Sequence, residues 1–226
     1  MDIRHERGIA MLMAMAATLL MSALGVALVL STSAEAVIAS NFRDTTECAY
    51  AAGAALDRAL DDLGAARDWN AVLTGAARST FVDGAPSGTR TLVDGSTVDL
   101  ERAVNLADCG RIQPCSDADM DAVTSRRPWG SNNPRWQLYA YGRFSDVLPG
   151  QTIDSPYYVM VMVGDDPSET DGKPLEDAAD AAGAGIVALR AEAFGPRGAH
   201  RSVEMTVARP AAGQPGLRLL SWREVR

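Results

Sequence analysis

The feature that most constrains this chain is a predominantly apolar run near its N-terminus. Residues 9–30 carry no charged side chain, and no charge occurs between Arg7 and Glu35. A helix of about 20 such residues is long enough to cross the hydrocarbon core of a bilayer. Arg4 and Arg7 precede the run. The positive-inside rule therefore predicts that the N-terminus stays in the cytoplasm and that the rest of the chain is exported.

The sequence leaves three fates open for this run. A secretory signal peptide would be removed at the Ala-Glu-Ala of residues 34–36, but the apolar part of such peptides has only about 7 to 15 residues. A plain membrane anchor would be kept whole. In the third interpretation, a leader of residues 1–8 is cut off between Gly8 and Ile9, and the apolar helix stays on the mature chain.

Composition argues against several classes of function. The net charge of −8 disfavours nucleic acid as a partner, because phosphate binding needs a basic surface. The chain has two histidines, and His5 lies in the leader, so a mature domain would keep only His200, which we expect to be solvated in a turn. This argues against a multi-histidine zinc site. No nucleophile elbow, phosphate-binding loop or His-Glu-x-x-His motif occurs, so an enzyme has no support in the sequence.

The three cysteines fit one disulfide and one free thiol if the domain is exported. Cys109 and Cys115 close a short loop, and this is the favoured pair. The alternative is three unpaired thiols, with Cys48 acting as a small apolar residue of a helix.

Helical periodicity continues beyond the apolar run, and residues 9–63 contain no proline. Residues 35–64 are amphipathic, with charged side chains opposite an apolar stripe. The apolar stripe consists of Ile38, Phe42, Thr45, Ala49, Ala52, Leu56, Ala59 or Leu60, and Leu63. The charged face consists of Arg43, Asp44, Glu47, Asp57, Arg58 and Asp61. Gly64 is a plausible end of the helix. Such a stripe must pack against something, and we expect residues 65–226 to supply a sheet.

Strand patterns dominate residues 65–226. Asp94-Gly95 predicts a tight hairpin within residues 91–98. Ser116 is expected to cap a short helix that ends near Thr124, and a loop at residues 125–135 follows. Strands are predicted at residues 136–141, 157–163, 186–194, 202–208 and 217–225. One long helix and consecutive strands with short connections predict an α+β fold with an antiparallel sheet.

The acidic loop between Gly164 and Gly172 is the strongest candidate for a chemical site. The carboxylates of Asp165, Asp166, Glu169 and Asp171 would offer oxygen ligands to calcium. Their spacing does not match the EF-hand pattern. A solvated acidic loop is therefore the preferred interpretation, with calcium as the alternative.

Several segments resemble known proteins. The residues Arg7-Gly8-Ile9-Ala10-Met11-Leu12-Met13 resemble the processing site of type IV prepilins. Residues 35–44 are similar to the conserved signature of PilX-type minor pilins, residues 49–56 resemble the stretch that follows it, and residues 221–224 resemble the last strand of some relatives. The resemblance covers residues 7–60 well and the remainder weakly.

This resemblance implies a pilin-like fold, cleavage by prepilin peptidase after Gly8, and a structural rather than enzymatic role. Most pilins carry a glutamate at the fifth mature position, which neutralises the N-terminal amine of a neighbouring subunit. Met13 stands there in this chain. With methionine at this position, the chain resembles PilX-type pilins and tip-type pseudopilins, which prime assembly or sit at the filament tip.

The partners implied are other minor pilins, the major pilin, prepilin peptidase and the bacterial inner membrane, with no nucleic acid. The implied location is a single-pass inner-membrane protein with a cytoplasmic N-terminus that later enters an extracellular pilus. Two alternatives stay open. One is a minor pseudopilin of type II secretion, and the other is an anchored or secreted domain that binds a ligand or calcium.

Overall fold

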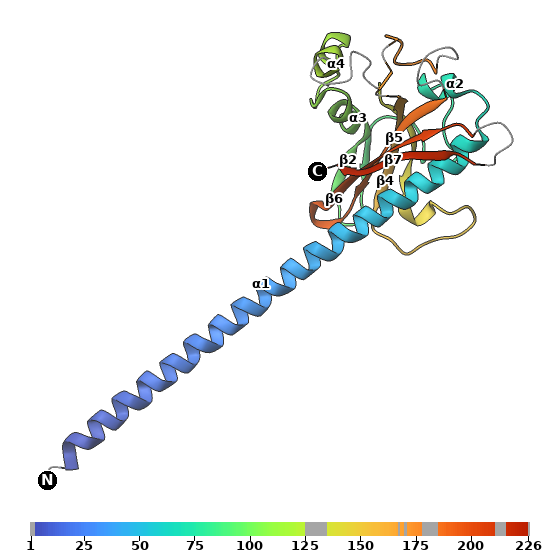
Figure 1. Ribbon diagram of the computed structural model, residues 1–226. Helices are drawn as coiled ribbons and strands as arrows, with labels where there is room; N and C mark the ends of the chain where they lie inside the picture. Colours follow the sequence, from blue (N-terminus) through green and yellow to red (C-terminus); the bar gives the residue numbers. More distant parts are fainter. Residues whose placement is uncertain are drawn as a thin grey trace. The chain divides into compact units, whose positions relative to one another are not determined.

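The computed structural model describes residues 3–124, 135–166, 168–169, 171–177, 185–210 and 216–225, with side chains from residue 9 onward. The chain divides into two compact units, residues 1–43 and residues 44–226. Figure 1 shows the long N-terminal helix and the sheet.

The predicted long helix is α1, Ile3–Ala65. It ends one residue after the expected stop at Gly64. Within the second unit, one face of α1 is buried and belongs to the main hydrophobic cluster. That face consists of Cys48, Ala51, Ala52, Ala55, Leu56, Ala59 and Leu63. Its many alanines favour the helix and allow a close approach to the sheet. Ile38 and Phe42, predicted on the same stripe, lie in the first unit and are exposed.

A five-stranded antiparallel sheet forms the centre of the second unit, in the order β3-β4-β5-β6-β7. Its strands are β3 (Gln137–Arg143), β4 (Tyr158–Asp165), β5 (Ile186–Phe194), β6 (His200–Ala208) and β7 (Arg218–Val225). Short 3₁₀ helices η1 (Phe144–Asp146) and η2 (Pro196–Gly198) follow β3 and β5. All five predicted strands are confirmed. Neighbouring strands in the sheet are also neighbours in sequence, as expected when connections are short.

The sheet is covered on both faces. Val159, Val161 and Val163 of β4 belong to the cluster that contains α1, whereas Met160 and Met162 belong to a second cluster on the other face. All eight residues of β4 are buried. This confirms the prediction from its continuous apolar run, because a strand covered on one face only would alternate with polar residues.

The second face is covered by elements between α1 and β3. These are the hairpin β1 (Thr89–Thr91) and β2 (Thr97–Asp99) and the helix α3 (Leu100–Cys109), which contribute Val98, Leu100 and Ala103 to the second cluster. The helix α4 (Asp117–Thr124) follows α3. The short α2 (Trp69–Leu73) follows α1, and its buried side chains belong to the cluster that contains α1. Figure 1 shows α3 and α4 on the side of the sheet away from α1. The hairpin is wider than the predicted two-residue turn, since Leu92 N–H donates to Ser96 C=O across it. Helices α2 and α3 were not predicted.

The outer edge of β3 is covered by the segment that follows α2. Ser79 N–H donates to Tyr139 C=O, and Tyr141 N–H donates to Phe81 C=O. Asp62 of α1 holds this segment, because its carboxylate accepts the backbone N–H of Thr80 at 2.8 Å. Burial opposes ionisation of Asp62, but these hydrogen bonds outweigh it and lower its pKa. The whole arrangement is an α+β, pilin-like fold, with a long N-terminal helix packed on an antiparallel sheet.

Candidate functional site

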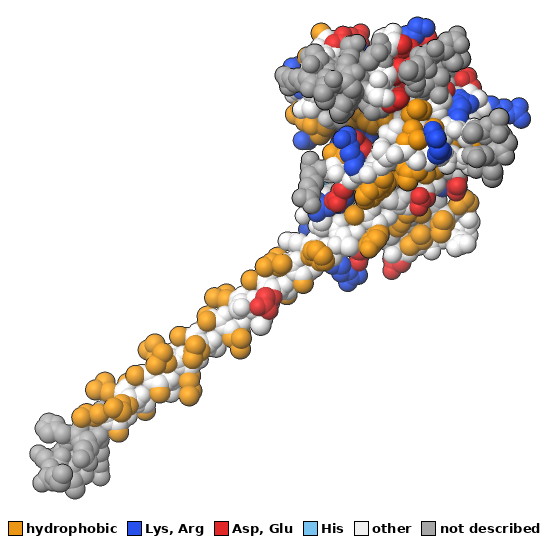
Figure 2. All heavy atoms as spheres, in the orientation of Figure 1, with side chains coloured by type: hydrophobic (Ala, Val, Ile, Leu, Met, Phe, Trp, Pro, Cys, Tyr) orange, Lys and Arg blue, Asp and Glu red, His pale blue; other side chains and the backbone are white. Residues whose placement is uncertain are grey.

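The first candidate is the apolar surface of α1 in the first unit. Its large side chains from Ile9 to Leu30 are more than half exposed: Ile9, Met11, Leu12, Met13, Met15, Leu19, Leu20, Met21, Leu24, Val26, Leu28, Val29 and Leu30. Figure 2 shows hydrophobic side chains along the visible side of this part of the helix. A soluble protein rarely exposes so much contiguous apolar surface unless lipid or another protein covers it.

Three polar side chains of α1 in the first unit form hydrogen bonds within the helix. The hydroxyl of Thr18 donates to Met15 C=O at 2.9 Å, and that of Ser33 donates to Val29 C=O at 2.8 Å. Thr32 bonds in the same way to the preceding turn. Because these groups do not depend on water for hydrogen bonds, the segment is suited to an apolar environment.

The segment has the length and composition of a membrane-spanning helix, and its most apolar stretch is not buried within the chain. One long apolar N-terminal helix is consistent with a single membrane span or a signal-like segment. The predicted cleavage residues Gly8 and Ile9 both lie inside α1, and Met13 lies on its exposed surface.

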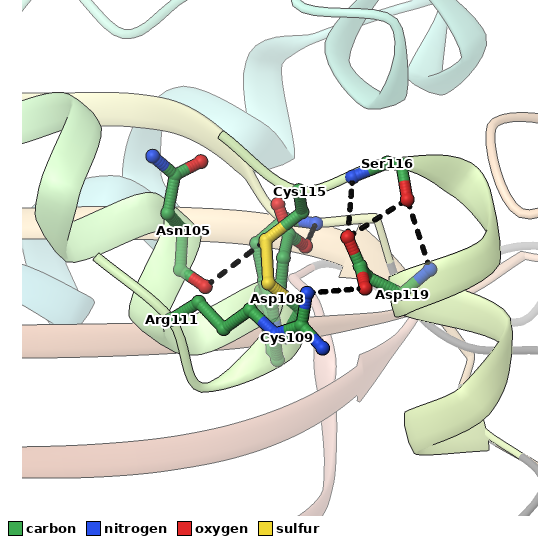
Figure 3. The surroundings of a disulfide bond; sticks show 8 residues. Asn105, Asp108, Cys109, Arg111, Cys115, Ser116 and Asp119 are labelled. Atoms are coloured by element: carbon green, nitrogen blue, oxygen red, sulfur yellow. Dashed lines mark hydrogen bonds and ion pairs between the residues drawn. A yellow bond between two sulfur atoms is a disulfide. The ribbon is translucent and has the colours of Figure 1, made fainter. Parts of the chain in front are cut away.

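A disulfide joins Cys109, the last residue of α3, to Cys115, with Cα atoms 6.1 Å apart. Figure 3 shows its surroundings. Directly after it, the hydroxyl of Ser116 donates to the carboxylate of Asp119 and accepts from the Asp119 N–H. This reciprocal cap at the start of α4 is the one expected from the sequence. Arg111 pairs with Asp119 at 2.5 Å, so the disulfide loop and α4 are joined by covalent, cap and ionic contacts.

Asp108 connects the same region to the sheet. Its carboxylate accepts the backbone N–H of Trp136 at 2.8 Å, just before β3. Burial raises the pKa of Asp108 to about 6, although this bond and nearby Arg135 oppose the rise. Trp136 is buried in the second cluster, so it anchors the start of β3 in the core. Trp129 and most of its predicted loop lie outside the described residues.

Cys48, the free cysteine, is buried in α1. Burial, and secondarily the charge of Asp44, raises the pKa of its thiol to about 12. A thiol that does not ionise near neutral pH is a poor nucleophile. Nearby, Tyr157 donates its hydroxyl to Glu47 at 2.8 Å. The arrangement around Cys48 packs α1 onto the sheet and offers no reactive centre.

The acidic loop after β4 is not the solvated loop that the sequence suggested. Asp165, Asp166 and Glu169 are at most 5 % exposed, whereas Asp171 is exposed. Asp166 accepts both the backbone N–H and the hydroxyl of Ser168. Within the described parts of the chain, no three carboxylate, histidine or cysteine side chains are placed to hold a metal ion together. The structure therefore does not assemble the predicted calcium ligands into a site.

A cleft of about 460 Å³ lies between α3, the β1–β2 hairpin and the ends of β5 and β6. The rings of Phe194 and His200 stack in its wall, 4.7 Å between centroids. Glu192, almost fully buried, accepts from Arg190 at 2.8 Å and lies 3.2 Å from His200. His200 is exposed, as predicted, and it also lies beside the Glu192 carboxylate.

The charges around this cleft nearly cancel. Arg102 and Asp99 line it with opposite signs, and Glu192 is neutralised by Arg190. The cleft thus has the size of a small-ligand site but selects neither an anion nor a cation. The cleft was not predictable from the sequence, because its side chains come from five elements. The charged residues Arg190 and Glu192 within an otherwise apolar strand were nevertheless a visible signal.

Among the described residues, the structure thus presents an extended apolar surface on α1 and a cleft of balanced charge beside α3. Searches for similarity returned no matching family model, no matching curated protein and no matching solved structure.

Proposed function

We propose that this chain is a minor pilin of the PilX type. It is made as a prepilin, cut by prepilin peptidase between Gly8 and Ile9, and held in the bacterial inner membrane by residues 9–34. It is then incorporated into a type IV pilus or primes its assembly. In this proposal the chain catalyses no reaction. A minor pseudopilin of type II secretion would use the same surface and is the nearest alternative.

The observation that carries the proposal is the length of the exposed apolar surface on α1. Residues 9–30 form a helix of about 33 Å, which matches a hydrocarbon core of about 30 Å. Ile38 and Phe42 lie about 12 Å and 18 Å beyond Leu30 along the helix axis, yet they are 67 % and 74 % exposed. A lone membrane anchor leaves both in water, whereas a bundle of subunit helices covers them.

The absence of a carboxylate at Met13 supports a minor rather than a major subunit. An unpaired charged side chain inside a bilayer is energetically costly. A subunit that does not need to neutralise the amine of a neighbour is therefore inserted more favourably with methionine at this position.

N-terminal sequencing of the mature chain, produced together with a prepilin peptidase, tests the proposal. We expect a start at Ile9. Gly8→Val is expected to abolish cleavage, because a β-branched side chain then precedes the scissile bond. The control is Gly25→Val, the same change in the same helix, where an added Cβ meets nothing within 4 Å; its cleavage should be normal.

Two other results would contradict the proposal. A mature start near Val37 identifies a conventional exported protein, and an intact Met1 identifies a plain membrane anchor. In either case, cleavage between Gly8 and Ile9 plays no part in maturation.

A further inference from the structure

The cleft beside α3 is lined by polar side chains that the described residues leave without a partner. The hydroxyls of Thr89 and Thr97, on the β1–β2 hairpin, form no hydrogen bond within the described chain. The guanidinium group of Arg102, on α3, forms neither a hydrogen bond nor an ion pair there. All three line the same space of about 460 Å³. A few polar groups that converge on a concave surface are typical of a small-ligand site.

The sheet contributes a fixed hydrogen-bond acceptor to the cleft. Glu192 is 5 % exposed, and its carboxylate accepts from Nε of Arg190 at 2.8 Å and lies 3.2 Å from Nε2 of His200. Burial opposes ionisation of Glu192, but the contacts with His200 and Arg190 outweigh it and lower its pKa. An ionised carboxylate has about four acceptor positions. Glu192 therefore retains acceptor positions that a ligand hydroxyl can use.

The remaining lining of the cleft is apolar or aromatic. It consists of Val98, Ala103, Leu106, Phe194 and the ring of His200. The rings of Phe194 and His200 are stacked with 18° between their planes, and His200 is the exposed member of the pair. An aromatic ring face is slightly negative and attracts the slightly positive hydrogens of C–H groups. The cleft therefore combines an aromatic platform with hydrogen-bonding groups around it.

The charges and the backbone of the cleft narrow the class of ligand. Asp99 and Arg102 line it with opposite signs, and Arg190 neutralises Glu192, so a neutral ligand fits better than an ion. A purely apolar ligand would leave the polar groups without partners. A peptide that binds as an added strand needs a free sheet edge, but β5 and β6 are paired with each other along their whole length. A neutral, hydroxyl-rich ring satisfies all three conditions.

We propose that this cleft binds a neutral saccharide, with one side of a pyranose ring on the Phe194–His200 stack and its hydroxyls bonded to Thr97, Arg102 and Glu192. A hydroxyl both donates and accepts hydrogen bonds. Arg102 only donates, ionised Glu192 only accepts, and Thr97 does both, so the three groups complement neighbouring hydroxyls of one ring. Because the cleft lies within the second unit, the proposal does not depend on how the N-terminus is processed.

Saturation-transfer NMR on the full-length chain tests the proposal, in a polyoxyethylene detergent so that the micelle supplies no sugar. The probes are the methyl glycosides of glucose, galactose and mannose, which differ in the orientation of single hydroxyl groups. We expect at least one of them to bind with a measurable Kd. Arg102→Ala should weaken this binding by about tenfold or more, and Thr97→Val by about fivefold, because they remove a charged and a neutral hydrogen bond.

Two variants serve as matched controls, Arg67→Ala and Thr91→Val. Both residues are exposed and lie outside the cleft lining, and Thr91 is opposite Thr97 in the same hairpin. They should bind as the wild type does, and circular dichroism should show that all four variants are folded. The proposal is overturned if no glycoside binds to the folded wild type, or if cleft and control variants bind equally. It is also overturned if trialanine binds in the cleft and the glycosides do not, because the cleft is then a peptide site.

Discussion

At the scale of single residues, close packing rather than backbone conformation explains why residue 195 is a glycine. Gly195 has a φ of −133°, which any residue adopts. However, an added Cβ would lie 2.4 Å from Cε1 of Tyr157 and 3.0 Å from Sγ of Cys48. Gly195→Ala should therefore lower the free energy of unfolding by about 1 to 3 kcal/mol, as overpacking does. Urea unfolding of the full chain in detergent measures this change.

The matched control is Gly53→Ala on α1, where the added Cβ meets nothing within 4 Å. Alanine is a better helix former than glycine, so this change should raise stability by up to about 1 kcal/mol. If both variants lose the same stability, tight packing at Gly195 is not the explanation.

Which side chains are buried was predictable only where a pattern repeats. The inward positions Val187, Leu189, Val203 and Val207 follow strand alternation, and all are buried. Burial of Glu169 was not predictable, because it depends on a turn folding back toward its strand. Asp44 was assigned to the charged face of α1, but it is buried and paired with Arg197 of η2. That contact joins residues far apart in sequence, so a helical pattern contains no sign of it.

At the scale of elements, α4 depends on its attachments rather than on a core. None of its described side chains is buried, and the disulfide of Cys109 and Cys115 closes the loop that precedes it. Replacing both cysteines by serine should lower the free energy of unfolding by about 2 kcal/mol, the value for so short a loop in the chain-entropy model. Hydrogen exchange should show loss of protection in α4 and little change in the sheet.

Treatment of the wild type with a reducing agent should reproduce the effect of the double substitution, since Cys48 takes part in no disulfide. Full protection of α4 after removal of the disulfide would show that its cap and ion pairs are sufficient.

The long and periodic elements were predictable, whereas of the short helices α4 was predicted from its capping residue Ser116 and α2 and α3 were not. Helix α1 and the five main strands each repeat one period over many residues. Helix α3 was missed even though it has a capping aspartate, Asp99, and a terminal glycine, Gly110, with φ of 71°. The helix lies between a predicted hairpin and the predicted disulfide loop, and the pattern of that loop was taken to begin at residue 105. Helix α2 has only five residues, which is too short for a period to be visible.

At the scale of the whole molecule, the sequence determined the α+β class but not the fate of the N-terminal segment. The fold follows from burial of one face of α1 against a sheet, which is encoded in patterns along the chain. In the proposed function, removal of residues 1–8 would depend on a peptidase, and it would leave the core of the second unit unchanged, because that core lies within residues 44–226.

The location of the buried core indicates which part of the chain the second unit needs in order to fold. Every buried residue of both hydrophobic clusters, from Cys48 onward, lies within residues 44–226. We expect a chain of residues 44–226 to be soluble without detergent and to unfold cooperatively, measured by circular dichroism and sedimentation. Leu56→Ala in this shortened chain should cost about 2 to 5 kcal/mol, because Leu56 is fully buried on α1. Its exposed neighbour Asp57 provides the control, as Asp57→Ala should cost far less. If the shortened chain aggregates or lacks cooperative unfolding, the apolar first part of α1 is needed for folding as well as for assembly.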